Sequence, residues 1–166
     1  MCRLIHGFLV GGVLVGSLFL GGVCAQGKRP ESGQEQAASV ELTNSHPKSS
    51  FAVSADVLAR SPSVVALSFT RVVNPARTAF AIFVYLSYRP PEAADAAPLK
   101  ILVGNGSLYP ADRPGGFLLR VSAAFGKLKA AKATDVRLVL EMRRIHSAEP
   151  WSQVEVTAAP PQWRSQ

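Results

Sequence analysis

Few side chains in this sequence have the types and spacing that catalysis or metal binding requires. Beyond the N-terminal apolar segment the histidines are His46 and His146, which do not lie at the spacing of a metal-ligand pair. A metal site in a protein normally needs three or more side-chain ligands. We therefore interpret both histidines as surface residues and expect no metal and no other cofactor.

The carboxylates form no recognisable catalytic pair. Asp112 and Asp135 fall at expected turns, while Glu141 and Glu155 occupy the polar positions of alternating segments. A pair of carboxylates that meet across the fold, as in glycosidases, is an alternative that the sequence leaves open. We expect a non-enzymatic protein, and an enzyme with a cryptic carboxylate site is the competing hypothesis.

A short glycine-rich motif, Gly104-Asn105-Gly106-Ser107, is similar to a phosphate-binding loop. That chemistry needs a helix N-terminus and a Lys-Ser or Lys-Thr pair after the loop, and neither occurs here. We interpret the motif as a turn or bulge that ends a strand. The serines of the predicted strands lack a nucleophile-elbow motif, so a hydrolase triad has no support.

One loop between two predicted strands is the candidate partner-binding site. Its residues of interest are Leu108, Tyr109, Pro110, Asp112, Arg113 and Phe117. In one interpretation Leu108, Tyr109 and Phe117 fold back onto the core. In the other, Tyr109 projects as an aromatic anchor into a partner, as aromatic residues often do at interfaces.

Residues 1–25 have the three parts of a secretory signal peptide: a basic start, an uncharged apolar run and the small-residue junction Val23-Cys24-Ala25. We expect cleavage between Ala25 and Gln26 and export to a periplasm or to the medium. An uncleaved anchor and lipid attachment at Cys24 are the alternatives. Cleavage would remove both cysteines, so the exported chain would have neither a disulfide nor a thiolate site.

The remaining chain divides by composition. Residues 26–48 are rich in Ser, Gln and Glu and predict a flexible polar linker, in which Val40-Glu41-Leu42 could form a short edge strand. Residues 49–158 carry the strand patterns, which are found at 51–57, 64–73, 79–88, 99–103, 117–121, 136–145 and 153–157. Residues 159–166, which include Pro160-Pro161, predict a disordered tail.

This order of elements indicates the fold class. Residues 123–133 are the only helical candidate, and Gly126 weakens it. Seven or eight short strands, at most one short helix and no strand-helix-strand alternation predict an all-β, antiparallel, jelly-roll-like β-sandwich. Exposed edges of such a sandwich would allow pairing with another chain.

The net charge of +7 is spread along the chain. We expect no nucleic-acid partner, because the chain has no interleaved aromatic and basic motif. An acidic surface, such as an envelope polymer, lipid headgroups or an acidic protein, is a compatible partner. A basic surface that only keeps the protein soluble is the alternative.

Four segments occur in the order found in a known family. Residues 82–87 (Ile-Phe-Val-Tyr-Leu-Ser) loosely match a Lys-Phe-Asp-Val-Tyr-Val-Asn strand, and residues 103–107 (Val-Gly-Asn-Gly-Ser) closely match Val-Gly-Asn-Phe-Ser. Residues 119–128 stand at the place of an Arg-Leu-Gly stretch, and residues 136–140 at that of a Val-Val-Val-Thr-Leu strand. Over about residues 69–156 the chain thus resembles the C-terminal, shielding domain of plant-type polyphenol oxidases and tyrosinase-like proteins.

The departures limit what the resemblance implies. Phe83 replaces the Asp of the family, residues 109–116 replace a histidine-rich or lysine-rich loop, and the copper-binding domain is absent. The resemblance therefore implies the fold but not oxidase activity. Since the domain covers the copper site in that family, a separate copy would act as a cap or assembly partner for such an oxidase. Tyr109 or Phe117 would then be the blocking residue.

We therefore expect an exported, non-enzymatic β-sandwich that binds a protein or an envelope component. A carbohydrate-binding surface module is the alternative, in which Tyr88, Trp151 or Trp163 would stack on sugar rings.

Overall fold

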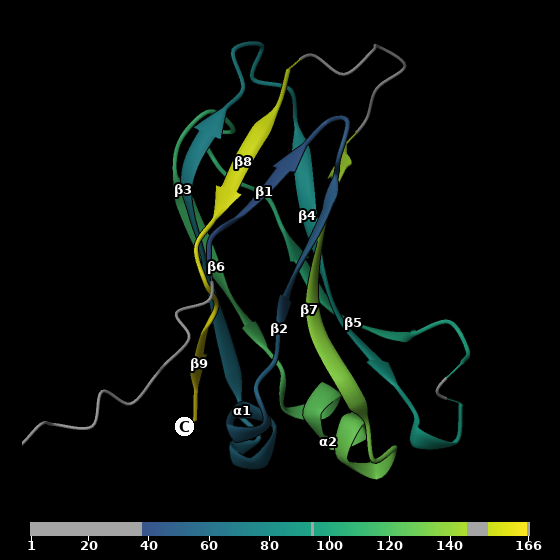
Figure 1. Cartoon of the computed structure of the whole chain (residues 1–166). Helices are drawn as coiled ribbons and strands as arrows, with labels where there is room; N and C mark the ends of the chain where they lie inside the picture. Colours follow the sequence, from purple (N-terminus) through teal and green to yellow (C-terminus); the bar gives the residue numbers. More distant parts are fainter. Residues whose placement is uncertain (1–37, 94, 146–152, 166) are drawn as a thin grey trace, which may run out of the picture. The chain divides into compact units, whose positions relative to one another are not determined.

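The computed structural model describes residues 38–93, 95–145 and 153–165. The predicted cleavage site at Ala25 and Gln26, the alternative lipidation site Cys24, and the residues His146 and Trp151 lie outside these ranges. The described residues form two antiparallel sheets that pack face to face (Figure 1). The predicted all-β sandwich is confirmed.

The strand order is that of a jelly roll. One sheet has the order β1 (Val40–Thr43), β8 (Glu155–Ala158), β3 (Val64–Val73), β6 (Gly115–Arg120), with β9 (Gln162–Arg164) also paired to β3. The other has the order β2 (Lys48–Ala52), β7 (Thr134–Arg144), β4 (Phe80–Arg89), β5 (Leu99–Gly106). The antiparallel pairs β1–β8, β2–β7, β3–β6 and β4–β5 are nested within one another, as in a rolled-up hairpin.

The core lies between the sheets and follows from the period-two pattern of the strands. In β7 the residues Val136, Leu138, Leu140 and Met142 are buried, as their alternation predicts. The matching faces of β4 and β3 are buried too, with Phe80, Ile82, Val84 and Leu86 on one and Val65, Leu67 and Phe69 on the other. Full burial of one such side chain contributes about 1.5–3 kcal/mol, so the central strands supply most of the stability.

The folded domain extends beyond the predicted bounds of 49–158 at both ends, and the short edge strand suggested at Val40-Glu41-Leu42 is confirmed. Strand β1 lies within the predicted linker, and its Leu42 is fully buried because β1 pairs with β8. The predicted tail contains β9, which pairs with residues 64–66 of β3. Trp163 of β9 packs edge-on against Phe125, with ring centroids 5.6 Å apart. Strand β1 adds Leu42 and Val40 to the core, and β9 adds Trp163. Composition averaged over a longer segment does not reveal the contribution of β9.

The described residues contain two α-helices where at most one was predicted. Helix α2 (Ser122–Ala130) confirms the helical candidate. Helix α1 (Ala55–Arg60) lies where residues 51–57 predicted a strand throughout, so that prediction was wrong for its second half. Ser54 caps α1 by accepting a hydrogen bond from the backbone N–H of Val57 at 3.4 Å. A single-turn 3-10 helix, η1 (Pro91–Ala93), follows β4.

The glycine-rich motif is part of β5. The pairing of β5 with β4 shifts between Gly104 and Leu102, so the predicted bulge is present, but the strand continues to Gly106. A Cβ on Gly106 would lie 2.6 Å from the ring of Phe117, and one on Gly104 would lie 3.0 Å from Leu119. The glycines therefore let β6 side chains approach β5, rather than form a turn or cradle a phosphate.

Candidate functional site

The loop at residues 107–114 joins β5 to β6 at the end of the sandwich opposite the two α-helices (Figure 1). Its side chains divide between the core and the solvent. Leu108 is buried, and Phe117 is half-buried with its ring 5.5 Å from that of Phe69. Tyr109 is fully exposed (100%). The two interpretations of this loop therefore each hold in part: Leu108 and Phe117 fold back, and Tyr109 projects.

The turn between β3 and β4 holds this loop in place. The buried Asn74 donates hydrogen bonds from Nδ2 to the backbone oxygens of Thr78 (2.9 Å) and Ala111 (3.0 Å). Its Oδ1 accepts a hydrogen bond from the backbone N–H of Thr78 at 2.9 Å. One side chain thus connects the turn to the loop, and because it is buried its loss would leave polar groups unsatisfied.

An ion pair makes the second connection. Arg77 Nε lies 2.7 Å from Asp112 Oδ2. The hydrogen bond from Arg77, with the charges of Arg77 and Arg113, holds the pKa of the Asp112 carboxyl below its usual range, although burial opposes this. Asp112 is therefore ionised at neutral pH and has a structural partner. Pro110 and Arg113, the other two predicted site residues, are exposed beside Tyr109.

An open depression adjoins the loop. It has a volume of about 630 Å³ and is lined by Val72, Val73, Asn74, Pro75, Arg77 and Asp112. The residues that anchor the loop therefore also form the floor of a concavity. The projecting Tyr109 ring and the neighbouring depression together give this surface a shape that a complementary partner surface could fit.

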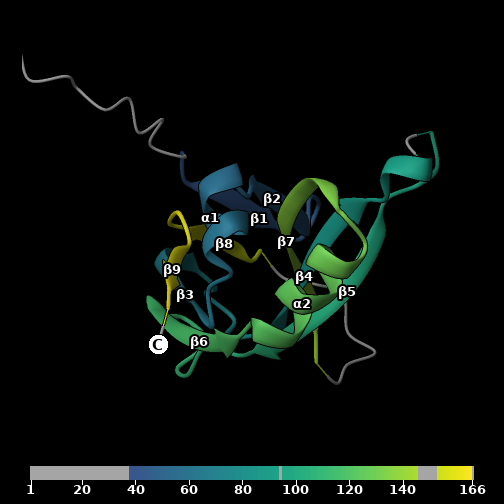
Figure 2. The same ribbon diagram turned by 90° about the horizontal axis from the view of Figure 1, so that it is seen from below.

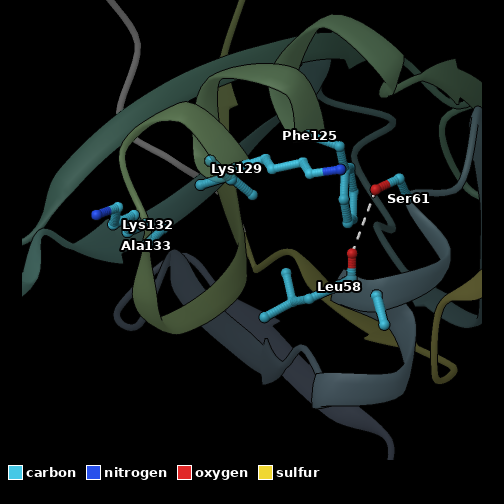
Figure 3. Close-up of a pocket in the computed structure, with 8 residues that line it drawn as sticks. Leu58, Ser61, Phe125, Lys129, Lys132 and Ala133 are labelled. Carbon is cyan, nitrogen blue, oxygen red and sulfur yellow. Dashed lines mark hydrogen bonds between the residues drawn. The ribbon is translucent and has the colours of Figure 1, made fainter.

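A second cavity lies between α1 and α2, at the opposite end of the sandwich. Figure 2 looks at this end, with both helices in the foreground. The cavity has a volume of about 420 Å³ and is lined by Leu58, Ala59, Ser61, Phe125, Leu128, Lys129, Lys132 and Ala133. In Figure 3 the Lys129 side chain points toward Phe125 and Ser61, whereas Lys132 points away from them.

The chemistry of this second cavity is limited. The only hydroxyl of its lining, on Ser61, donates a hydrogen bond to the Leu58 carbonyl at 3.3 Å. No carboxylate or imidazole is present among the lining residues to activate that hydroxyl. The walls offer apolar contact and two ammonium groups instead of an acid-base pair. Sequence analysis missed this cavity because α1 was predicted as a strand.

The four carboxylates considered for catalysis each lie beside a cation. Asp112 pairs with Arg77, Asp135 with Arg89, Glu141 with Lys48 and Arg143, and Glu155 with Arg71. His46 is exposed, as predicted, and its Nδ1 lies 3.1 Å from Ser45 Oγ. Across the described parts of the chain, no three His, Cys, Asp or Glu side chains gather as a metal site would require.

No helix within the described ranges is both long and apolar enough to cross a membrane.

The aromatic residues proposed for sugar stacking are engaged in packing. Tyr88 and Trp163 are both half-buried and pack against the core. Neither ring is fully exposed, and the stacking of Tyr88 or Trp163 on sugar rings stays a prediction.

Comparison with known proteins gave no relative: no protein family, curated protein or solved structure matches this chain.

Proposed function

We propose that this protein is an exported, non-enzymatic module that binds a protein partner through the loop at residues 107–114. The observation that carries the proposal is the full exposure of Tyr109 on a loop that Asn74 and Arg77 hold at Ala111 and Asp112. Tyrosine gives a large amphipathic contact area and has few rotatable bonds, so its burial at an interface costs little side-chain entropy.

The anchoring supports this proposal physically. A loop that becomes ordered only on binding loses affinity through the entropy of ordering. Here Asn74 and the Arg77–Asp112 pair fix the loop in the free protein. The adjoining depression offers a recess for a side chain of the partner, while Arg113 adds an exposed cation next to the anchor.

The narrower form of the proposal names a tyrosinase-like copper oxidase as the partner, with this protein as its cap or assembly partner. Its support is the sequence resemblance together with the projecting ring. Tyr109 is then the blocking residue, because Phe117 is half-buried against Phe69 and is not free to enter another protein. Export rests on the predicted signal peptide.

A capture experiment tests the proposal. The tagged full chain and its Tyr109→Ala variant are expressed in the host, and proteins cross-linked to each are quantified in the envelope and secreted fractions. We expect a specific protein whose recovery falls by about tenfold, since loss of a central aromatic anchor costs about 1.4 kcal/mol or more. Recovery of a copper oxidase supports the narrower form.

Leu118→Ala is the matched control. Leu118 is also an exposed apolar residue (63%), but it lies on β6 outside the loop. Its replacement should leave the recovery of the partner unchanged. Equal recovery with the wild-type and Tyr109→Ala chains would show that the loop is not the binding site.

A further inference from the structure

The outer face of the four-stranded sheet is a second surface with a distinct chemistry. Alternate residues of β4, β7, β2 and β5 point away from the core, since their neighbours Ile82, Val84 and Leu86 are buried. We call this outward surface the basic face. The strand register places nine residues in its adjoining rows: Phe83, Tyr85, Leu102, Val139, Glu141, Arg143, Lys48, Lys100 and Arg137.

The centre of the basic face is apolar. Tyr85 pairs with Val139 on one side and with Leu102 on the other. Leu102 is 55% exposed, while Phe83, Tyr85 and Val139 are half-buried. The face therefore presents an apolar strip across three strands, with Leu102 as its most exposed side chain.

The aromatic rings of this strip hold cations at its margin. The Arg143 guanidinium lies 4.6 Å from the centroid of Phe83, and its Nη2 donates a hydrogen bond to the Tyr85 hydroxyl at 2.9 Å. Lys100 Nζ lies 5.8 Å from the centroid of the Tyr85 ring. These contacts orient the cations in the free protein through cation–π attraction.

Positive charge is in excess on this face. Glu141 is its one carboxylate, and it is matched by Arg143 at 3.0 Å and by Lys48 at 3.7 Å. Burial would raise the pKa of Glu141, but the hydrogen bond from Arg143 and the nearby cations outweigh burial and hold it below the usual range. Within the described ranges, neither Lys100 nor Arg137 forms a close ion pair with a carboxylate. The charge of Lys100 contributes to the lowered pKa of Glu141, and Arg137 donates to Ser50 Oγ at 3.1 Å.

The cations of the basic face are spread both across and along the sheet. Lys100 and Arg137 are both in register with Ser87, on the strands that flank β4, which places their backbones about 10 Å apart. Arg137 and Arg143 are separated by six positions on β7, or about 20 Å of extended strand. Simultaneous contact with all three therefore requires a ligand that repeats its negative charge.

We infer that the basic face binds an acidic polysaccharide. The apolar faces of the sugar rings lie along Tyr85, Leu102 and Val139, and the acidic groups of the polymer pair with Lys100, Arg137 and Arg143. An extended surface fits a linear polymer better than a lipid bilayer, because Leu102 is the one mostly exposed apolar side chain of the strip and Phe83, Tyr85 and Val139 are half-buried. The surface differs from the Tyr109 loop, so this inference does not depend on the proposed function.

Titration of the full chain with two forms of one polymer tests the inference. Polygalacturonate carries a carboxylate on every sugar, and its methyl-esterified form has the same backbone without the charge. We expect binding of polygalacturonate that weakens as the salt concentration rises and at least about tenfold weaker binding of the ester. Equal binding of the two forms would overturn the inference.

Charge-matched variants locate the site. Lys100→Gln with Arg137→Gln should weaken the binding of polygalacturonate by about tenfold. Arg120→Gln with Lys127→Gln removes the same charge from β6 and α2 and should leave the affinity nearly unchanged. Equal weakening by both pairs would indicate a non-specific effect of net charge and contradict the site.

Two further measurements keep the outcome unambiguous. Tyr109→Ala should bind polygalacturonate as the wild type does, which separates this inference from the proposed function. Vesicles of phosphatidylglycerol should bind more weakly than polygalacturonate. Tighter binding of the vesicles would identify the face as a membrane surface and overturn the polysaccharide assignment.

Discussion

At the scale of single residues, the space around each glycine in the fold explains whether a larger side chain is tolerated there. Gly116 of β6 would place a Cβ 2.3 Å from the backbone oxygen of Leu67, whereas Gly126 of α2 has no atom within 4 Å of such a Cβ. Both look alike in the sequence, and only the first is required by packing. Packing also requires Gly106, whose missing side chain makes room for Phe117.

This contrast gives a paired prediction. Gly116→Ala should lower the free energy of unfolding by about 1–3 kcal/mol, because the backbone of β3 must shift. Gly126→Ala should raise it by about 1 kcal/mol, since alanine is the better helix former at an exposed position. Urea denaturation followed by circular dichroism measures both. A loss of stability in both variants would show that α2 is not formed as described.

The Arg77–Asp112 pair predicts a dependence of stability on pH. The pKa of Asp112 is lowered in the folded state from its ordinary value of 3.8, so the ion pair stabilises the fold above that pH. Its contribution is lost as the pH falls below 3.8 through the folded-state pKa. The stability difference between wild type and Asp112→Asn should therefore be largest near neutral pH and shrink in acid. A difference that grows below pH 3.8 would have the wrong sign.

At the scale of elements, the sequence predicted most of the strands, including the short β1 and β8, and missed the shortest one, β9. Strands β3, β4 and β7 have ten or eleven residues. Apolar alternation marks β7 and part of β3, and a nearly continuous apolar run marks β4. Strand β9 has three residues, of which only Trp163 is apolar, and its pairing with β3 depends on a partner about 100 positions earlier in the chain. Helix α1 was missed because its six residues carry the apolar residues Val57 and Leu58 in a segment that follows a true strand.

Strand β9 therefore makes a testable contribution. Trp163→Ala should lower the free energy of unfolding by about 1–3 kcal/mol, because it removes the packing against Phe125. Arg164→Ala, an exposed neighbour in the same strand, should change it by less than about 0.5 kcal/mol. Chemical denaturation followed by far-ultraviolet circular dichroism is suitable, since it does not depend on tryptophan emission. If Trp163→Ala proved as stable as the wild type, β9 would not be part of the folded domain.

At the scale of the whole molecule, the jelly roll separates three surfaces. The Tyr109 loop lies at one end, the cavity between α1 and α2 lies at the other, and the basic face covers one sheet. The sequence indicated the loop because turn residues flanked Tyr109. It could not indicate the basic face, since Lys48, Lys100, Arg137 and Arg143 come from three separate segments that only the strand register brings together.

The central claim is that Tyr109 is the residue a partner covers, and tyrosine footprinting tests it most directly. The three tyrosines of the chain are Tyr85, Tyr88 and Tyr109, and the first two are half-buried and serve as internal references. The full chain is labelled with a tyrosine-specific reagent, alone and after addition of the envelope and secreted fractions of its host. We expect strong labelling of Tyr109 in the free protein and about tenfold less with the partner present, with Tyr88 unchanged. Equal labelling of Tyr109 in both conditions would contradict the claim.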